Sequence, residues 1–88
     1  MSQAIFISKS GYEAVVFSSE RTKPRTRPVR FKRLESSMRP FPDAFATPGD
    51  IHVRRDVRIS KTAATMRRDL LLQMGWKRLG GPTSRSRK

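Results

Sequence analysis

Proline limits what the middle of this chain can fold into, because five of the six prolines lie between residues 24 and 48. Proline fixes its own φ and lacks a backbone N–H, so it interrupts helices and central strands. Within the same region, residues 21–33 read RTKPRTRPVRFKR, with seven basic residues and no acidic one. The sequence therefore predicts an extended basic arm over residues 21–33, close to polyproline II in conformation.

The charge of the whole chain has the same sign as the arm. Twenty basic residues against seven acidic ones give a net charge of +13 on 88 residues, of which 35% are hydrophobic. We expect one small domain with a modest core, ordered in part by an anionic partner. Fourteen of the basic residues are arginine, whose planar guanidinium binds phosphate through two donors, although the codon usage of a GC-rich genome gives the same excess.

The expected fold is α+β, with a small β-hairpin plus a third strand and one C-terminal helix. Residues 1–18 are predicted to form the hairpin, because two β-branched and aromatic runs flank the turn residues Lys9-Ser10-Gly11. Residues 19–50 are predicted to form the long extended arm and loop, and residues 51–79 the strand plus helix. Residues 80–88 are predicted to form a basic flexible tail, and a partner is expected to order part of the chain.

The third strand is predicted over residues 51–59, IHVRRDVRI, where apolar and polar residues alternate with a period of two. Its apolar residues are expected on one face and Arg54 and Arg58 together on the other. Arg55 interrupts this alternation, because it falls on the apolar side. The prediction is a strand whose outer face is polar and basic.

The helix is predicted over residues 61–74, KTAATMRRDLLLQM, with Ser60 as its N-cap and Gly75 after its last turn. Four apolar residues recur at helical spacing and are expected to pack against the sheet. These four residues are Ala63, Met66, Leu70 and Met74, and Leu71 widens the stripe. A DNA-reading helix-turn-helix is not favoured, because no first helix precedes this one.

The predicted RNA-binding residues lie on the arm, the strand face, the helix and the tail. Closely spaced cations on an extended chain can follow a phosphate backbone, and Phe31 among them is expected to stack on a base. They are Arg21, Lys23, Arg25, Arg27, Arg30, Phe31, Lys32, Arg33, Arg54, Arg58, Arg68, Lys77, Arg78, Arg85, Arg87 and Lys88. A solvated charged linker, or a PxxP segment read by an SH3-like partner, remains the alternative for the arm.

Several classes of function are disfavoured by the residue types present. The chain has no cysteine and one histidine, so neither a disulfide nor a cysteine-containing zinc site is expected, and no metal or other cofactor is predicted. The seven acidic residues are scattered, and there is no P-loop, so we expect neither an enzyme nor a small-molecule substrate. No apolar run approaches the ~20 residues of a membrane span. An intracellular location is expected, with cytoplasm and mitochondrion both open.

The function predicted from these patterns is a small structural RNA-binding protein that neutralises and bridges RNA phosphates. A ribosome or another ribonucleoprotein is the expected setting, with rRNA and neighbouring proteins of a large assembly as partners. The likeness to small ribosomal proteins is one of composition. The alternative is a viral or phage regulator, or a small accessory subunit, bound to an acidic surface of a larger complex. Phe41, Phe45 and Trp76 would then be anchors.

Overall fold

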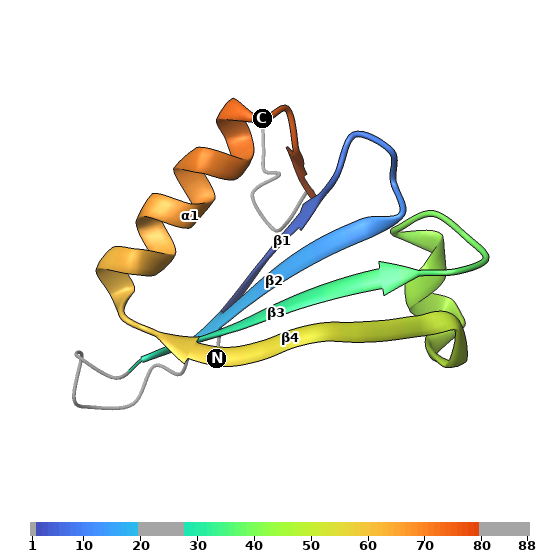
Figure 1. Cartoon of the computed structure of the whole chain (residues 1–88), viewed down its shortest axis with the longest axis horizontal. Helices are drawn as coiled ribbons and strands as arrows, with labels where there is room; N and C mark the ends of the chain where they lie inside the picture. Colours follow the sequence, from blue (N-terminus) through green and yellow to red (C-terminus); the bar gives the residue numbers. More distant parts are fainter. Residues whose placement is uncertain (1, 20–27, 80–88) are drawn as a thin grey trace.

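Four strands follow one another along the chain before the single α-helix. The computed structural model describes residues 2–19 and 28–79. All strand pairs are antiparallel, and the strand order in the sheet is β4-β3-β2-β1-β5 (Figure 1). The elements are β1 (Ser2–Ile7), β2 (Glu13–Ser19), β3 (Val29–Ser36), the 3-10 turns η1 (Asp43–Ala46) and η2 (Pro48–Asp50), β4 (Ile51–Ile59), α1 (Lys61–Gln73) and β5 (Lys77–Arg78). The α+β class expected from the sequence is confirmed.

The expected hairpin is present, formed by β1 and β2. Gly11 in its turn has φ of 87°, a left-handed conformation that favours glycine. A Cβ at this position would lie 3.2 Å from the Cβ of Pro40, so the turn also allows the later loop to approach closely. The Phe41 N–H donates to the Gly11 carbonyl at 2.7 Å, which ties that loop to the hairpin.

Strand β3 corrects the prediction of an extended arm over residues 21–33. Residues 30–33 are paired on both sides, with β2 and with β4, and Val29 is paired with β4. Val29 and Phe31 are buried on one face of the sheet and Leu34 on the other, because a central strand buries both faces. Pro28 precedes the strand, a position at which proline removes no ladder hydrogen bond. Residues 21–27 of the predicted arm lie outside the described residues.

The sheet has a hydrophobic cluster on each face. We call the face covered by α1 the helix face; its cluster comprises Ala4, Phe6, Val15, Phe17, Val29, Phe31 and Ala64. We call the other the loop face, because the segment containing η1 covers it; its cluster comprises Ala14, Val16, Leu34, Phe41 and Ala44. The Phe17 ring lies 5.9 Å from that of Phe6 and 5.4 Å from that of Phe31, measured between centroids. Phe17 is therefore central to the helix-face cluster.

The loop-face cluster also corrects the expectation that Phe41 anchors a protein partner. Its side chain is 5% exposed, and its ring centroid lies 4.8 Å from that of the half-buried Phe45. Both rings pack against the loop face of this chain. The two phenylalanines therefore complete the core of this chain.

A β-bulge in β4 makes the prediction of one apolar face wrong. Arg33 is opposite Arg55 and Leu34 is opposite Val53, so Arg54 is the extra residue. The bulge reverses the alternation of side chains along the strand. Ile51 therefore packs in the loop-face cluster, whereas Ile59 packs in the helix-face cluster.

Helix α1 begins at Lys61 as predicted and ends at Gln73, one residue before the predicted end, but of the predicted stripe only Leu71 packs against the helix-face cluster. The Ser60 Oγ accepts a hydrogen bond from the Ala63 N–H at 3.1 Å, and Gly75 has φ of 92° after the last turn. Ala64 and Leu71 face the sheet.

The predicted packing of the Met66, Leu70 and Met74 stripe is wrong, because these side chains are 67%, 53% and 54% exposed. The buried stripe lies one residue further along the helix, a rotation of roughly 100° about its axis. The small side chain of Ala64 rather than a large one meets the rings of the sheet at this contact.

Candidate nucleic-acid interface

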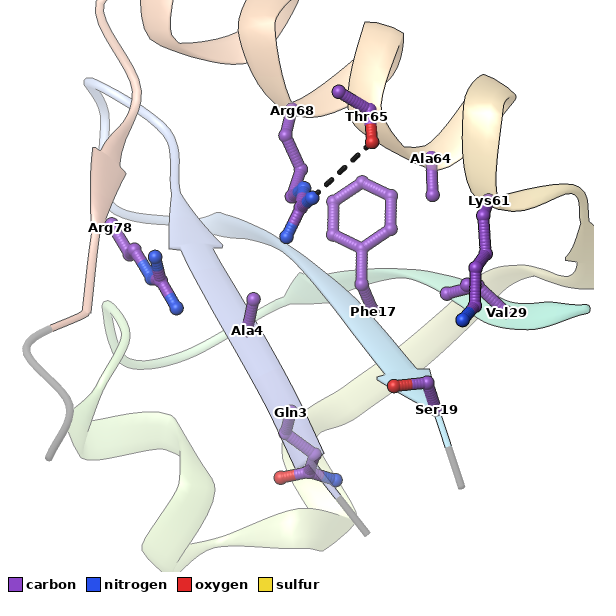
Figure 2. Close-up of a pocket in the computed structure, with 10 residues that line it drawn as sticks. All are labelled: Gln3, Ala4, Phe17, Ser19, Val29, Lys61, Ala64, Thr65, Arg68 and Arg78. Atoms are coloured by element: carbon purple, nitrogen blue, oxygen red, sulfur yellow. Dashed lines mark hydrogen bonds between the residues drawn. The ribbon is translucent and has the colours of Figure 1, made fainter. Parts of the chain in front are cut away.

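Three basic side chains surround a hollow at one end of the helix face. Lys61 and Arg68 come from α1, and Arg78 comes from β5 (Figure 2). The hollow has a volume of about 250 Å³, and Phe17 and Ala4 contribute to its floor. We call this site the basic hollow. No acidic side chain is among the described residues that line it.

Local structure explains why these three cations line the same hollow. Arg78 is opposite Phe6 in the β1–β5 pair, and residues opposite each other share a face, so its side chain lies on the helix face. Lys61 and Arg68 are seven residues apart, two turns of helix, which places them on one side of α1. The Arg68 guanidinium donates to the Thr65 Oγ1 at 3.4 Å and extends from the helix towards the sheet (Figure 2).

The charges of the basic hollow are not compensated by any carboxylate of the described residues. Within the described part of the chain, Lys61, Arg68 and Arg78 form no ion pair. Elsewhere on the sheet, three arginines each have a carboxylate: Arg30 with Asp56, Arg33 with Glu13, and Arg54 with Glu35. The basic hollow is therefore lined by three cations that have no ion-pair partner among the described residues.

The residues that flank the first predicted basic segment line the basic hollow, and the second segment follows β5. Ser19, the last residue of β2, and Val29, the first of β3, both line the basic hollow, so residues 20–27 begin and end beside it. Leu79 donates its N–H to the Ile5 carbonyl at 2.7 Å. Leu79, which precedes residues 80–88, therefore lies next to Arg78 beside the middle of β1.

Seven of the predicted RNA-binding residues belong to those two segments. They lie outside the described residues, and only their points of attachment are placed. These residues are Arg21, Lys23, Arg25, Arg27, Arg85, Arg87 and Lys88.

A second basic group lies at this end of the sheet on the loop face. Arg30 is opposite Arg58, and Lys32 is opposite Asp56. Arg30 donates to both carboxylate oxygens of Asp56, at 2.9 and 2.8 Å. This hydrogen bonding lowers the pKa of Asp56 from its ordinary value and raises the pKa of Arg30. Arg58 and Lys32 have no ion pair among the described residues.

The expected pairing of Arg54 and Arg58 on one face is wrong because of the bulge. Arg54 reaches Glu35 at 2.7 Å, and Arg33 reaches Glu13 at 2.7 Å, in a group on the helix face that also includes Arg55. Arg58 lies on the loop face, opposite Arg30. Lys77 also belongs to the loop face, at the other end of β1, opposite Ile7.

The structure places both Phe31, the candidate stacking ring, and Trp76, the candidate anchor, in or beside the core. Phe31 is only 5% exposed, and the guanidinium carbon of Arg67 lies 5.0 Å from its ring centroid, so a base has no access to that ring. The expectation that Phe31 stacks on RNA is therefore wrong. Trp76 is half-buried against the helix-face cluster, as a residue that closes the end of the helix would be.

Lys61 lines the basic hollow but is not among the RNA-binding residues predicted from the sequence. The seven-residue spacing between Lys61 and Arg68 was the available signal, because it places both on one side of a helix. The contribution of Arg78 to the same hollow depends on the β1–β5 pairing, which joins the two ends of the chain. A two-residue strand gives no period by which it can be recognised.

Comparison with protein-family models, with curated proteins and with solved structures finds no match to this chain. Among the described residues, no helix combines the length and the hydropathy needed to cross a membrane. The same part of the chain contains no group of three or more His, Cys, Asp or Glu side chains able to hold a metal ion.

Proposed function

We propose that this protein binds RNA through the basic hollow and the two basic segments that join the sheet beside it. One observation supports the proposal most strongly. Lys61, Arg68 and Arg78 line one hollow with no carboxylate among its described residues, beside the strand ends that flank residues 20–27 and near Leu79, which precedes residues 80–88. A structural role in a ribosome or a similar ribonucleoprotein is the setting that we propose.

The chemistry of the basic hollow suits a backbone phosphate. Two guanidinium groups offer planar sets of donors, and an ammonium group adds a compact charge. Gln3, Ser19 and Thr65 add polar side chains around these cations. Phe17 is buried in the floor, so recognition would depend on phosphate position and RNA shape rather than on stacking with a base.

A second candidate function is binding to an acidic surface of a larger protein assembly. The observation that favours it is the exposed apolar side of α1. Ala63, Met66 and Leu70 line a shallow hollow on this helix, together with Arg67 and Asp69. Large exposed apolar side chains in one stripe are typical of a surface that a protein partner covers.

A salt titration tests the proposal and separates the two candidates. We expect binding to a fluorescein-labelled structured RNA to weaken steeply between about 0.05 and about 0.2 M salt, with a log–log slope of about 3 or more. Fluorescence anisotropy measures this slope, and polyglutamate serves as the competing polyanion. Polyglutamate that displaces RNA at equal charge concentration, or a slope below about 1, would exclude phosphate-directed binding.

A further inference from the structure

In the part of the chain that the structure describes, strand β4 forms an open edge of the sheet. It comprises nine residues without proline, and all seven residues from His52 to Arg58 are exposed. The opposite edge differs, since β5 covers part of β1 there. A long unpaired edge is a template for another strand, and monomeric proteins usually shorten or cover such an edge.

The side chains at the end of β4 after the bulge alternate regularly. Arg55, Val57 and Ile59 are opposite Arg33, Phe31 and Val29, which places them on the helix face. Asp56 and Arg58 are opposite Lys32 and Arg30 on the loop face. Antiparallel pairing of two identical edges about a twofold axis keeps equivalent faces on the same side, because the axis is perpendicular to the sheet.

One register of such pairing is complementary in charge. With Val57 opposite Val57 of a second copy, Asp56 lies opposite Arg58 of that copy, and Arg58 lies opposite its Asp56. Arg55 then lies opposite Ile59. Opposite charges directly across a strand pair stabilise it. The pairing also gives a carboxylate to Arg58, which has no ion pair among the described residues and lies opposite Arg30.

Neighbouring registers are unfavourable. Moving the centre by one residue places Asp56 opposite Asp56, or Arg58 opposite Arg58, and like charges across a strand pair are destabilising. A centre at Arg55 places two arginines at the axis and crosses the bulge. Arg54 would then be opposite Asp56, although they lie on different faces. A centre between two residues also brings side chains of different faces opposite each other.

We propose that this protein forms a homodimer through antiparallel pairing of β4 with β4 of a second copy, centred on Val57. The product is a continuous ten-stranded sheet that carries both α1 helices on one face. Each basic hollow lies on the helix face of its own copy, so the two hollows lie on the same side of the dimer. This inference does not depend on what those hollows bind.

The first test is the mass of the nuclease-treated chain. Sedimentation velocity between about 1 μM and about 1 mM protein should show a concentration-dependent rise from 10.1 kDa towards twice this mass. A single species of monomer mass throughout this range would overturn the proposal.

Two matched valine variants test the register. Val57→Lys places two ammonium groups at the axis, and we expect the dimer dissociation constant to rise at least about 10-fold. Val53→Lys is the control: Val53 is 57% exposed on the same strand, beyond the bulge, against 38% for Val57. Equal effects of the two substitutions, with folded spectra for both, would contradict pairing about Val57.

Charge reversal provides a test that a general loss of stability cannot imitate. Asp56→Arg and Arg58→Asp should each weaken self-association, because each places like charges opposite one another. Mixed together, the two variants should form a heterodimer, since every charged pair across the axis is then complementary. Failure of the mixture to associate more tightly than either variant alone would refute the register.

Discussion

Replacing Lys61, Arg68 and Arg78 together by glutamine is expected to weaken RNA binding about 100-fold at about 0.1 M salt. The magnitude follows from counterion release. Each cation that neutralises a phosphate contributes about 0.7 to 0.9 to the log–log slope, so three contribute about 2 to 3. The salt slope should fall by the same amount, and fluorescence anisotropy on one labelled RNA measures both quantities.

The control for this triple variant removes the same charge elsewhere. Lys9, Arg39 and Arg54 are exposed cations away from the basic hollow, and their replacement by glutamine also lowers the net charge by three. We expect this control to change the affinity less than about 10-fold, through the long-range field alone. Equal losses in the two triple variants would show that net charge, and not the basic hollow, determines binding.

Phe17→Ala is expected to destabilise the fold by about 3 to 5 kcal/mol. Phe17 is 4% exposed, and its ring contacts those of Phe6 and Phe31, so truncation removes the centre of the helix-face cluster. A chain of this length has a total stability of about 4 to 13 kcal/mol, so the loss is a large fraction of it. The midpoint of thermal unfolding, measured by circular dichroism, should fall by at least about 12 °C.

Tyr12→Ala is the aromatic control for this prediction. Tyr12 lies in the hairpin turn with 44% of its surface exposed, and its truncation should cost less than about 1 kcal/mol. A Phe17→Ala protein as stable as the Tyr12→Ala protein would mean that the helix-face cluster does not hold the helix and sheet together.

The elements with a clear local signal were predictable from the sequence. The two β-branched runs around Gly11 gave the hairpin, and Ser60 and Gly75 bounded the helix. Of the apolar stripe predicted for the helix, only Leu71 packs against the sheet, and Ala64 takes the place predicted for Ala63. The pattern of α1 offers apolar residues on more than one side, and only the packing against Phe17 and Phe31 selects among them.

Strand β3 and the bulge in β4 show two different limits of structure prediction from this sequence. The basic side chains and prolines around β3 led to the prediction of an extended arm. Val29, Phe31 and Leu34 nevertheless provide apolar side chains for both faces of the sheet. The sequence did carry a sign of the bulge, because Arg55 falls on the apolar side of the alternating pattern of residues 51–59. The sequence could not show that the strand absorbs this interruption by adding a residue at Arg54, because the pairing with β3 decides it.

The candidate site was less predictable than the fold. Residue type suggested the cations, but pairing decided which ones are free: Glu13 and Glu35 neutralise Arg33 and Arg54. The basic hollow instead joins a helix start, a helix middle and a terminal strand. These positions are brought together only by the order of strands in the sheet.

The most direct test of the central claim is the position of RNA on the folded protein. In ¹H–¹⁵N spectra recorded during an RNA titration, we expect the largest amide shifts at the basic hollow, including Ser19, Lys61, Arg68 and Arg78. The loop that contains η1 and η2, at the other end of the sheet, should shift little. Shifts concentrated in that loop, with the basic hollow unperturbed, would contradict the proposed interface.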